Sequence, residues 1–182
     1  MNYDSINYTS TNLTASEYEN CAFSNCIFSE VDLSGIIFKD CEFKSCDFSL
    51  ATLKHTALNG VKFINCKMLG VHFDKVNAFL LSVDYDNCLL SMSSFYKLDL
   101  AKIRFKNCNL QEVDFSETNL TSSLFENCDL QGAKFNHTNL EKVDFRTSYS
   151  YSINPEINRL KKAKFSQSGV LGLLDKYNIL IE

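Results

Sequence analysis

Hydrophobic residues recur at every fifth position over most of the chain. One series runs from Leu13 to Phe73 and a second from Leu80 to Phe145, and every member is Leu, Phe, Tyr or Met. We call these residues centres. The position two before each centre holds a small or compact residue, and the remaining positions are mostly polar. A period of five fits neither the 3.6-residue period of a helix nor the alternation of a strand. The pattern therefore predicts an array of five-residue repeats.

A longer period, equal to four of these units, lies within the short one, and the cysteines show it. Two sets of cysteines are spaced at this interval: Cys26, Cys46 and Cys66, then Cys88, Cys108 and Cys128. Four five-residue units would thus complete one turn of a square coil, with successive coils about 4.8 Å apart, as hydrogen-bonded parallel strands are. The step from Phe73 to Leu80 is two positions longer than the regular step. This step predicts a two-residue bulge near Val76 and Asn77, and not a domain boundary.

The repeat units themselves carry a family resemblance. The consecutive units CDLQG, AKFNH and TNLEK (residues 128–142) match the loose consensus A(D/N)LXX of the pentapeptide-repeat family, which the chain resembles over about residues 11–148. The resemblance implies an all-β solenoid, a right-handed quadrilateral β-helix of about seven coils with a short C-terminal helix cap. We expect an N-terminal cap at 1–10, the β-helix at 11–150 and a capping and dimerisation segment at 151–182. Centres and the residues two before them are expected to point inward.

The C-terminal segment breaks the repeat and predicts a cap. The stretch SQSGVLGLLDKYNILIE offers Ser166 or Ser168 as the N-cap of a helix of about three turns, and NILIE as a following strand. The segment resembles the tails of the Qnr, MfpA and microcin B17 immunity group of the family, and INPEINRL (residues 153–160) is similar to the immunity protein in particular. That resemblance implies a homodimer formed through this segment. The candidate dimerisation residues are Val170, Leu171, Leu174, Tyr177, Ile179 and Ile181.

The eight cysteines are interpreted as structural. All stand two before a centre, so all are expected to point inward in parallel columns. Cβ atoms about 4.8 Å apart are wider than the ~3.8 Å typical of a disulfide, and a column does not supply the four convergent ligands that zinc needs. His55, His72 and His137 fall at outward positions. With no cluster of catalytic, cofactor-binding or metal-binding residues, the sequence favours a non-catalytic protein.

Outward acidic residues are the candidate partner-binding face. The candidates all directly precede a centre: Asp32, Glu42, Asp47, Asp84, Asp99, Asp114, Asp129 and Asp144. In the Qnr and MfpA relatives the rod is thought to imitate duplex DNA, so the resemblance implies binding to DNA gyrase or topoisomerase IV. Residues 1–153 carry 19 acidic and 13 basic side chains, a charge density well below that of DNA. The acids either imitate phosphates locally or keep the rod soluble and shape its turns.

Two hypotheses of function follow. The first is a DNA-mimic-like protein that binds gyrase or topoisomerase IV and gives immunity or resistance to poisons of quinolone or microcin type. The alternative is a scaffold that binds a protein other than a topoisomerase.

A net charge of −4 argues against direct nucleic-acid binding. The N-terminal residues lack the pattern of a signal peptide, and no apolar run approaches the ~18 residues that span a bilayer. The sequence thus predicts a cytoplasmic protein with no membrane contact.

Overall fold

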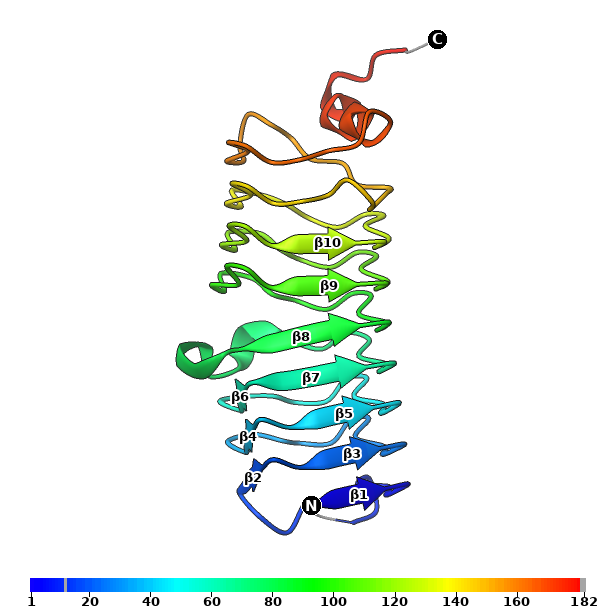
Figure 1. Ribbon diagram of the computed structural model, residues 1–182, viewed down its shortest axis with the longest axis vertical. Helices are drawn as coiled ribbons and strands as arrows, with labels where there is room; N and C mark the ends of the chain where they lie inside the picture. The colour runs from blue at the N-terminus through cyan, green and yellow to red at the C-terminus, as the bar shows by residue number, and fades with distance from the viewer. Residues whose placement is uncertain (12, 181–182) are drawn as a thin grey trace.

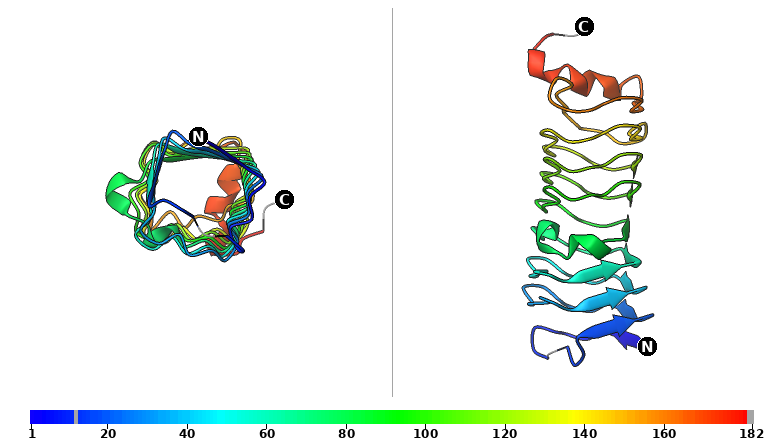
Figure 2. Two further views of the ribbon diagram at one scale, coloured as in Figure 1. Left: turned by 90° about the horizontal axis from the view of Figure 1, so that it is seen from below. Right: turned by 90° about the vertical axis from the view of Figure 1, so that its left-hand side faces the viewer.

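The computed structural model describes residues 1–11 and 13–180, and the side chains of all of them except Leu80. The chain winds as a four-sided coil that stacks into a rod, with the N-terminus at one end and the C-terminal segment at the other (Figures 1 and 2). The strands are β1 (Asn2–Asp4), β2 (Glu17–Glu19), β3 (Ala22–Ser24), β4 (Ile37–Lys39), β5 (Glu42–Lys44), β6 (Ala57–Asn59), β7 (Val61–Ile64), β8 (Val83–Asp86), β9 (Arg104–Lys106) and β10 (Leu124–Glu126). The helices are all 3-10 turns: η1 (Phe73–Lys75), η2 (Ala78–Leu80), η3 (Gly169–Leu173) and η4 (Asp175–Tyr177).

The strands form parallel ladders on the sides of the coil. A seven-stranded sheet has the order β1-β3-β5-β7-β8-β9-β10, and a three-stranded sheet has the order β2-β4-β6. Seven rungs on one side are separated by six turns of the chain. The all-β solenoid predicted from the repeat is therefore confirmed.

We number the four walls in chain order. The first wall is the seven-stranded sheet. The second is the column of single bridges from Asn7 to Tyr149, and the third contains the bridges Asp32–Thr52 and His72 to Lys134. The fourth contains β2, β4 and β6 and continues from Asp99 to Arg159.

A column of aromatic rings fills the coil behind the first wall. Its members are Tyr3, Phe23, Phe43, Phe63, Tyr85, Phe105, Phe125, Phe145 and Phe165, with successive ring centroids 4.6, 4.8, 5.3, 5.4, 5.2, 5.1, 4.9 and 5.6 Å apart. Each successive pair of rings is stacked, because one turn of four units brings both the backbone and the direction of the side chain back to the same orientation. Burying each ring contributes roughly 1.5–3 kcal/mol, so every turn adds a similar increment to the stability of the rod.

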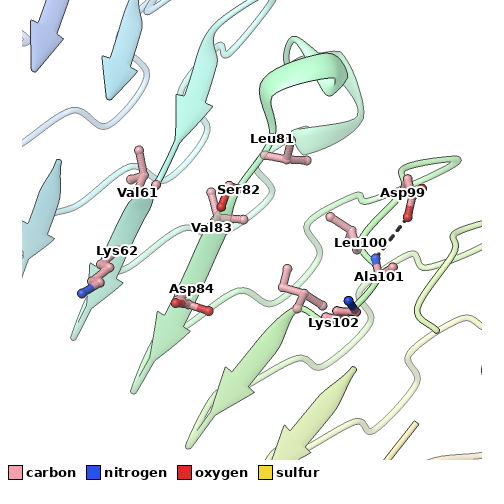
Figure 3. A pocket seen from close by; sticks show the side chains of 12 residues that line it. Val61, Lys62, Leu81, Ser82, Val83, Asp84, Asp99, Leu100, Ala101 and Lys102 are labelled. Atoms are coloured by element: carbon pink, nitrogen blue, oxygen red, sulfur yellow. Dashed lines mark hydrogen bonds between the residues drawn. The ribbon is translucent and has the colours of Figure 1, made fainter. Parts of the chain in front are cut away.

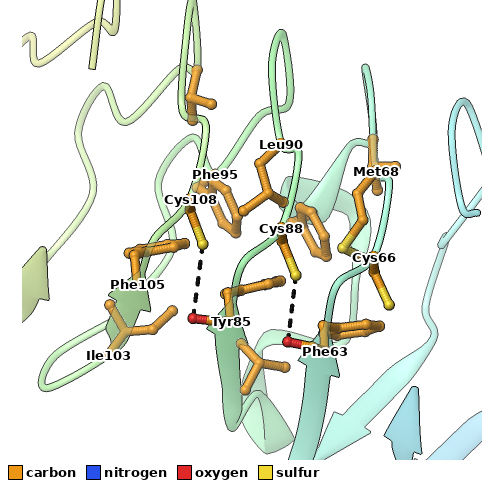
Figure 4. Packing of buried hydrophobic residues seen from close by; sticks show 14 of the residues in the cluster. Phe63, Cys66, Met68, Tyr85, Cys88, Leu90, Phe95, Ile103, Phe105 and Cys108 are labelled. Atoms are coloured by element: carbon orange, nitrogen blue, oxygen red, sulfur yellow. Dashed lines mark hydrogen bonds between the residues drawn. The ribbon is translucent and has the colours of Figure 1, made fainter. Parts of the chain in front are cut away.

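The second inward column is built of thiols, and each thiol has a hydrogen-bond acceptor. From Cys26 to Cys128, each Sγ in this column donates to the carbonyl oxygen of a first-wall centre in the coil before it, at 3.3–3.8 Å. Figure 4 shows two of these bonds, from Cys88 to Phe63 and from Cys108 to Tyr85. Ser148 continues the column with a 2.8 Å bond to the Phe125 oxygen. As the repeat predicts, all eight cysteines are buried, and all are free thiols.

The coil begins earlier than the predicted boundary at residue 11. Strand β1 pairs with β3 in the register Tyr3 to Phe23, and the ring of Tyr8 stacks on Phe28 at 4.6 Å. Both tyrosines extend the five-residue series of centres backwards, so the signal was present in residues 1–10.

The step between the two repeat series forms a protrusion on the rod. Val61 pairs with Val83 rather than with Leu81, so the register slips by two positions here. The two extra residues are accommodated in the segment of η1 and η2. The part around η2 projects from the left side of the rod in Figure 1, while Phe73 of η1 stays buried and stacks on Phe95. Asn77 caps η2 by accepting from the Phe79 N–H at 3.2 Å. The Phe79 side chain is 92% exposed.

The corners of the coil use a backbone conformation that the sequence did not predict. At most corners the residue two after a centre has positive φ, and most of these residues are not glycine. Examples are Leu50 at 59° and Met92 at 61°, both with exposed side chains. Asn is frequent here, as at Asn65, Asn87 and Asn107, because Asn tolerates the left-handed region better than most residues.

The C-terminal cap differs from the predicted helix of three turns. The coil first continues to Phe165, and the chain then forms only η3 and η4. Ser166, not Ser168, caps the segment, since its Oγ accepts from the Gly169 N–H at 2.9 Å. Gly172 lies against Tyr151, where a Cβ would collide with the tyrosine backbone. The two glycines disfavour an α-helix but permit this close approach. The predicted strand at NILIE is also wrong over residues 178–180.

Candidate functional site

The eight acids chosen from the sequence do not share one face. Glu42, Asp84 and Asp144 lie on the first wall, Asp47 and Asp129 on the second, Asp32 and Asp114 on the third, and Asp99 on the fourth. Their common position in the repeat makes them all point outward, but the square coil turns that direction by a quarter after every unit. A single acidic face therefore requires acids in every fourth unit, which the sequence does not have.

Six of the eight carboxylates stabilise the corner that follows them. In each of the six, Oδ1 accepts a hydrogen bond from the backbone N–H two residues later, at 2.8–3.2 Å: Asp32, Asp47, Asp99, Asp114, Asp129 and Asp144. Asn109 and Asn119 make the same turn with an uncharged oxygen. Geometry at this position therefore selects Asp or Asn alike. The turn itself therefore does not require the negative charge.

The two remaining acids belong to a ladder of alternating charge. On the first wall Glu42 pairs in register with Lys62, Lys62 with Asp84, and Asp84 with Arg104. This column is electrically mixed, unlike the uniform row of phosphates in DNA. Arg104 also contacts Glu126 at 3.2 Å on the same wall.

Two of the six turn-stabilising acids, Asp47 and Asp144, also lie beside cations. Asp47 lies 3.6 Å from the Lys67 amine. Asp144 contacts Arg146 at 2.8 Å and Lys164 at 3.7 Å. The hydrogen bond from Arg146 lowers the pKa of Asp144, so this carboxylate stays ionised at neutral pH. The C-terminal coils therefore present little net negative charge.

Two candidate acids meet at one hollow of ≈ 310 Å³ beside the protrusion (Figure 3). Asp84 reaches it from the first wall and Asp99 from the fourth, and Lys62 and Lys102 line the same hollow. Asp99 is already engaged with the Ala101 N–H at 3.1 Å. The mixed charge makes this hollow a poor mimic of a phosphate row.

The N-terminal end of the rod is the most acidic region in sequence, since residues 1–38 contain no Lys or Arg. In space, Lys39 of the next coil pairs with Glu19 at 2.5 Å. Glu17 and Glu19 lie on the fourth wall in β2, and Glu30 lies at the corner after the second wall, near Asp32 on the third. Three of these acids are outside the set chosen from the sequence. Glu19 and Glu30 follow a centre instead of preceding one, and Glu17 precedes the centre Tyr18 but was missed. The absence of basic residues was the signal that could have found them.

The predicted dimerisation residues are largely uncovered. Val170, Leu171, Tyr177 and Ile179 are 40%, 44%, 50% and 54% exposed, while Leu174 is half-buried. Ile181 lies outside the described residues. An apolar segment of this kind at one end of the rod is a candidate contact surface.

The described residues offer no metal site. Within residues 1–11 and 13–180, no group of three or more His, Cys, Asp or Glu side chains is arranged to hold an ion. In the same part of the chain the longest helix has five residues, and no helix is long and apolar enough to cross a bilayer.

The structure is a four-sided repeat solenoid, in which the position of a residue in its five-residue unit decides whether its side chain points inward or outward. A family model described as a pentapeptide repeat region matches residues 11–79 and 78–150. The chain belongs to the pentapeptide-repeat family. A search of curated proteins finds no match to the sequence.

Three solved structures are similar to the chain, and the first has the same fold. Full-length QnrB1, a plasmid-mediated fluoroquinolone resistance protein, is similar over 98% of this chain and 97% of its own, with 18% identity and a TM-score of 0.60. A trypsin-treated QnrB1 is similar over 100% and 98%, with 23% identity and a TM-score of 0.49. HetL from the cyanobacterium Nostoc, described as involved in heterocyst differentiation regulation, matches over 90% and 88%, with 13% identity and a TM-score of 0.31.

Proposed function

We propose that this protein is a non-catalytic binding rod whose partner is a type II topoisomerase, DNA gyrase or topoisomerase IV. Binding would protect the enzyme from a poison of quinolone or microcin type. The observation that carries the proposal is the fold similarity to full-length QnrB1, which extends over nearly the whole of both chains. The proposal places the protein in the cytoplasm, where these enzymes act.

The acidic N-terminal coils are the part of the rod that we assign to the enzyme. A topoisomerase surface that binds DNA is basic, and residues 1–38 of this chain present carboxylates with no Lys or Arg among them. The C-terminal coils contain Lys161, Lys162 and Lys164, so they do not fit such a surface. The exposed apolar residues of the C-terminal segment are then left for a second copy, and we include a homodimer through this segment in the proposal.

The test compares two variants that change the charge equally at opposite ends of the rod. One carries Glu17→Gln, Glu19→Gln, Glu30→Gln and Asp32→Asn. The matched control carries Glu126→Gln, Asp129→Asn, Glu141→Gln and Asp144→Asn. Both sets leave hydrogen-bonding oxygens in place. We expect wild type and control to bind gyrase subunits and preserve supercoiling in the presence of a quinolone or a microcin, and the N-terminal variant to lose both.

The proposal fails if micromolar wild-type protein neither binds the gyrase or topoisomerase IV subunits nor alters supercoiling with or without poison. Equal losses in the two variants would instead reject the assignment to the N-terminal end.

A second candidate is a scaffold for a protein other than a topoisomerase. The alternating charges of Glu42, Lys62, Asp84 and Arg104 favour it, because such a ladder complements a partner of mixed charge rather than a DNA-binding groove. Reversing Lys62 and Arg104 to Glu would abolish capture of that partner but leave gyrase binding intact.

A further inference from the structure

The stacking of the coils is interrupted on the third wall at the step just before the protrusion, and the same wall also lacks ladder bonds between residues 133–136 and residues 152–154. On most of the rod each rung is bonded to the next; for example, Leu33 N–H donates to the Thr52 oxygen at 2.9 Å. At the next step, no backbone hydrogen bond joins residues 51–54 to residues 70–74, all of which the structure describes. Thr52 is bridged to Asp32 and His72 to Ser94, but not to each other. The interruption coincides with η1, which turns the chain away from the ladder just before the protrusion.

The interruption opens a slot that is closed at both ends. At one corner the Leu50 N–H donates to the Leu69 oxygen at 2.9 Å, and at the other the His55 N–H donates to the Lys75 oxygen at 2.8 Å. The hollow between these two bonds measures ≈ 750 Å³. Ligand pockets in proteins have volumes of roughly 300–1,000 Å³, so the slot can receive a small organic molecule.

The lining of the slot changes from apolar to polar along its length. At the first corner it consists of Leu50, Ala51 and Gly70, and Leu53 and Val76 are buried beneath it. At the other corner it presents Lys54, His55, His72 and Lys75. The order follows the sequence LATLKH at 50–55, in which apolar residues precede basic ones.

The one acid in the slot is already satisfied. Asp74, whose side chain is only 7% exposed, contacts His72 Nδ1 at 3.1 Å through Oδ1 and Lys75 Nζ at 2.7 Å through Oδ2. Burial raises the pKa of Asp74, but the hydrogen bonds from Lys75 and His72 outweigh it and leave the pKa lowered. The contact to Nδ1 holds the His72 ring in place, and Nε2 is then a hydrogen-bond acceptor. Lys54 makes no ion pair among the described residues.

We propose that this slot binds an amphipathic organic anion, with an apolar body against Leu50 and Ala51 and a carboxylate or phosphate head group against Lys54. The backbone groups released from the ladder add hydrogen-bonding capacity along the slot. This site does not depend on the topoisomerase proposal, and each can fail without the other.

The test is calorimetric titration of the full chain with decanoate and with decyl phosphate, each below its micelle concentration. Decyltrimethylammonium, which has the same apolar body and the opposite charge, is the control ligand. We expect saturable one-to-one binding of one or both anions and none of the cation. Which anion binds more tightly distinguishes the two head groups.

Two variants locate the site. Lys54→Glu should weaken anion binding by about tenfold or more, since it removes a charge-assisted contact. Lys44→Glu is the matched control, because Lys44 occupies the same position of the repeat on the intact first wall, and it should leave binding unchanged. Thr52→Phe should block the slot without a change of charge. The proposal is overturned if neither anion binds, if the cation binds as tightly, or if the two Glu variants lose affinity equally.

Discussion

The thiol column gives the sharpest test of how the interior is arranged, through the substitution Cys108→Asp. Cys108 is 2% exposed, and its Sγ donates to the carbonyl oxygens of Lys106 at 3.2 Å and Tyr85 at 3.8 Å. A buried carboxylate in this place would face the two carbonyl oxygens, which repel it. It can be tolerated only when it is protonated, because the neutral acid has an O–H to donate. The variant therefore takes up a proton on folding at neutral pH.

The cost of that proton follows from the ordinary pKa of Asp. Keeping the acid neutral at pH 7, when the unfolded chain has a pKa near 3.9, costs about 4 kcal/mol, and at pH 5 it costs about 1.5 kcal/mol. The folded-state pKa is raised above the unfolded value. The loss of stability is therefore small below the unfolded pKa, and it grows as the pH rises toward the folded pKa.

Urea unfolding followed by circular dichroism at pH 7 and pH 5 measures both quantities. The control is Asn107→Asp, one residue away at an exposed corner, which should cost less than about 1 kcal/mol because any repulsion there is screened by solvent. Cys108→Ser should also be mild, since Ser148 makes the equivalent bond at 2.8 Å. Equal losses for Cys108→Asp and Asn107→Asp, or a loss at Cys108 that does not change with pH, would refute the inward assignment of the column.

Three further outcomes are expected. Phe105→Ala removes a fully buried ring from the aromatic column and should lower the free energy of unfolding by about 3–5 kcal/mol. Phe79→Ala on the exposed protrusion should change it by less than about 0.5 kcal/mol. Similar effects of the two substitutions in urea unfolding would contradict the packing. Met92→Gly should raise the melting temperature. It relieves the strain of a left-handed corner at φ 61°, roughly 1–2 kcal/mol, which exceeds the entropy cost of a glycine, roughly 0.5–1 kcal/mol. A lower melting temperature would argue against strain at this corner. Asp114→Ala should lose about 1 kcal/mol by removing the acceptor of the Ser116 N–H, while Asp114→Asn should retain stability, and equal losses in thermal unfolding would show that the charge rather than the turn matters.

Much of the fold was predictable because the repeat is local. A centre at every fifth residue determines which side chains turn inward, and the regular interval from Cys26 to Cys46 to Cys66 determines which of them stack. The longer step after Phe73 predicted the irregular turn, and Tyr3 and Tyr8 carried the same signal for the first coil. These properties follow from the sequence alone, since each unit repeats the environment of the unit four places before it.

The candidate site was less predictable, because the charges that lie together are those on the same wall, and neighbouring units in the sequence lie on different walls. Asp32 and Glu42 look equivalent in sequence, yet the coil directs them to the third and first walls, and only the structure shows that Asp32 caps a turn while Glu42 stands in register with Lys62. The C-terminal cap depended likewise on a tertiary contact, the close approach of Gly172 to Tyr151.

The sequence by itself determined the solenoid, its inward columns and the position of its irregular turn. The tertiary structure decided how that turn is absorbed: η1 leaves the ladder, and residues 51–54 separate from residues 70–74. No local pattern encodes this opening, because LATLKH at 50–55 reads as an ordinary pair of repeat units. Whether two coils bond to each other depends on both coils, and a two-residue insertion in one of them is enough to break the bonds between them.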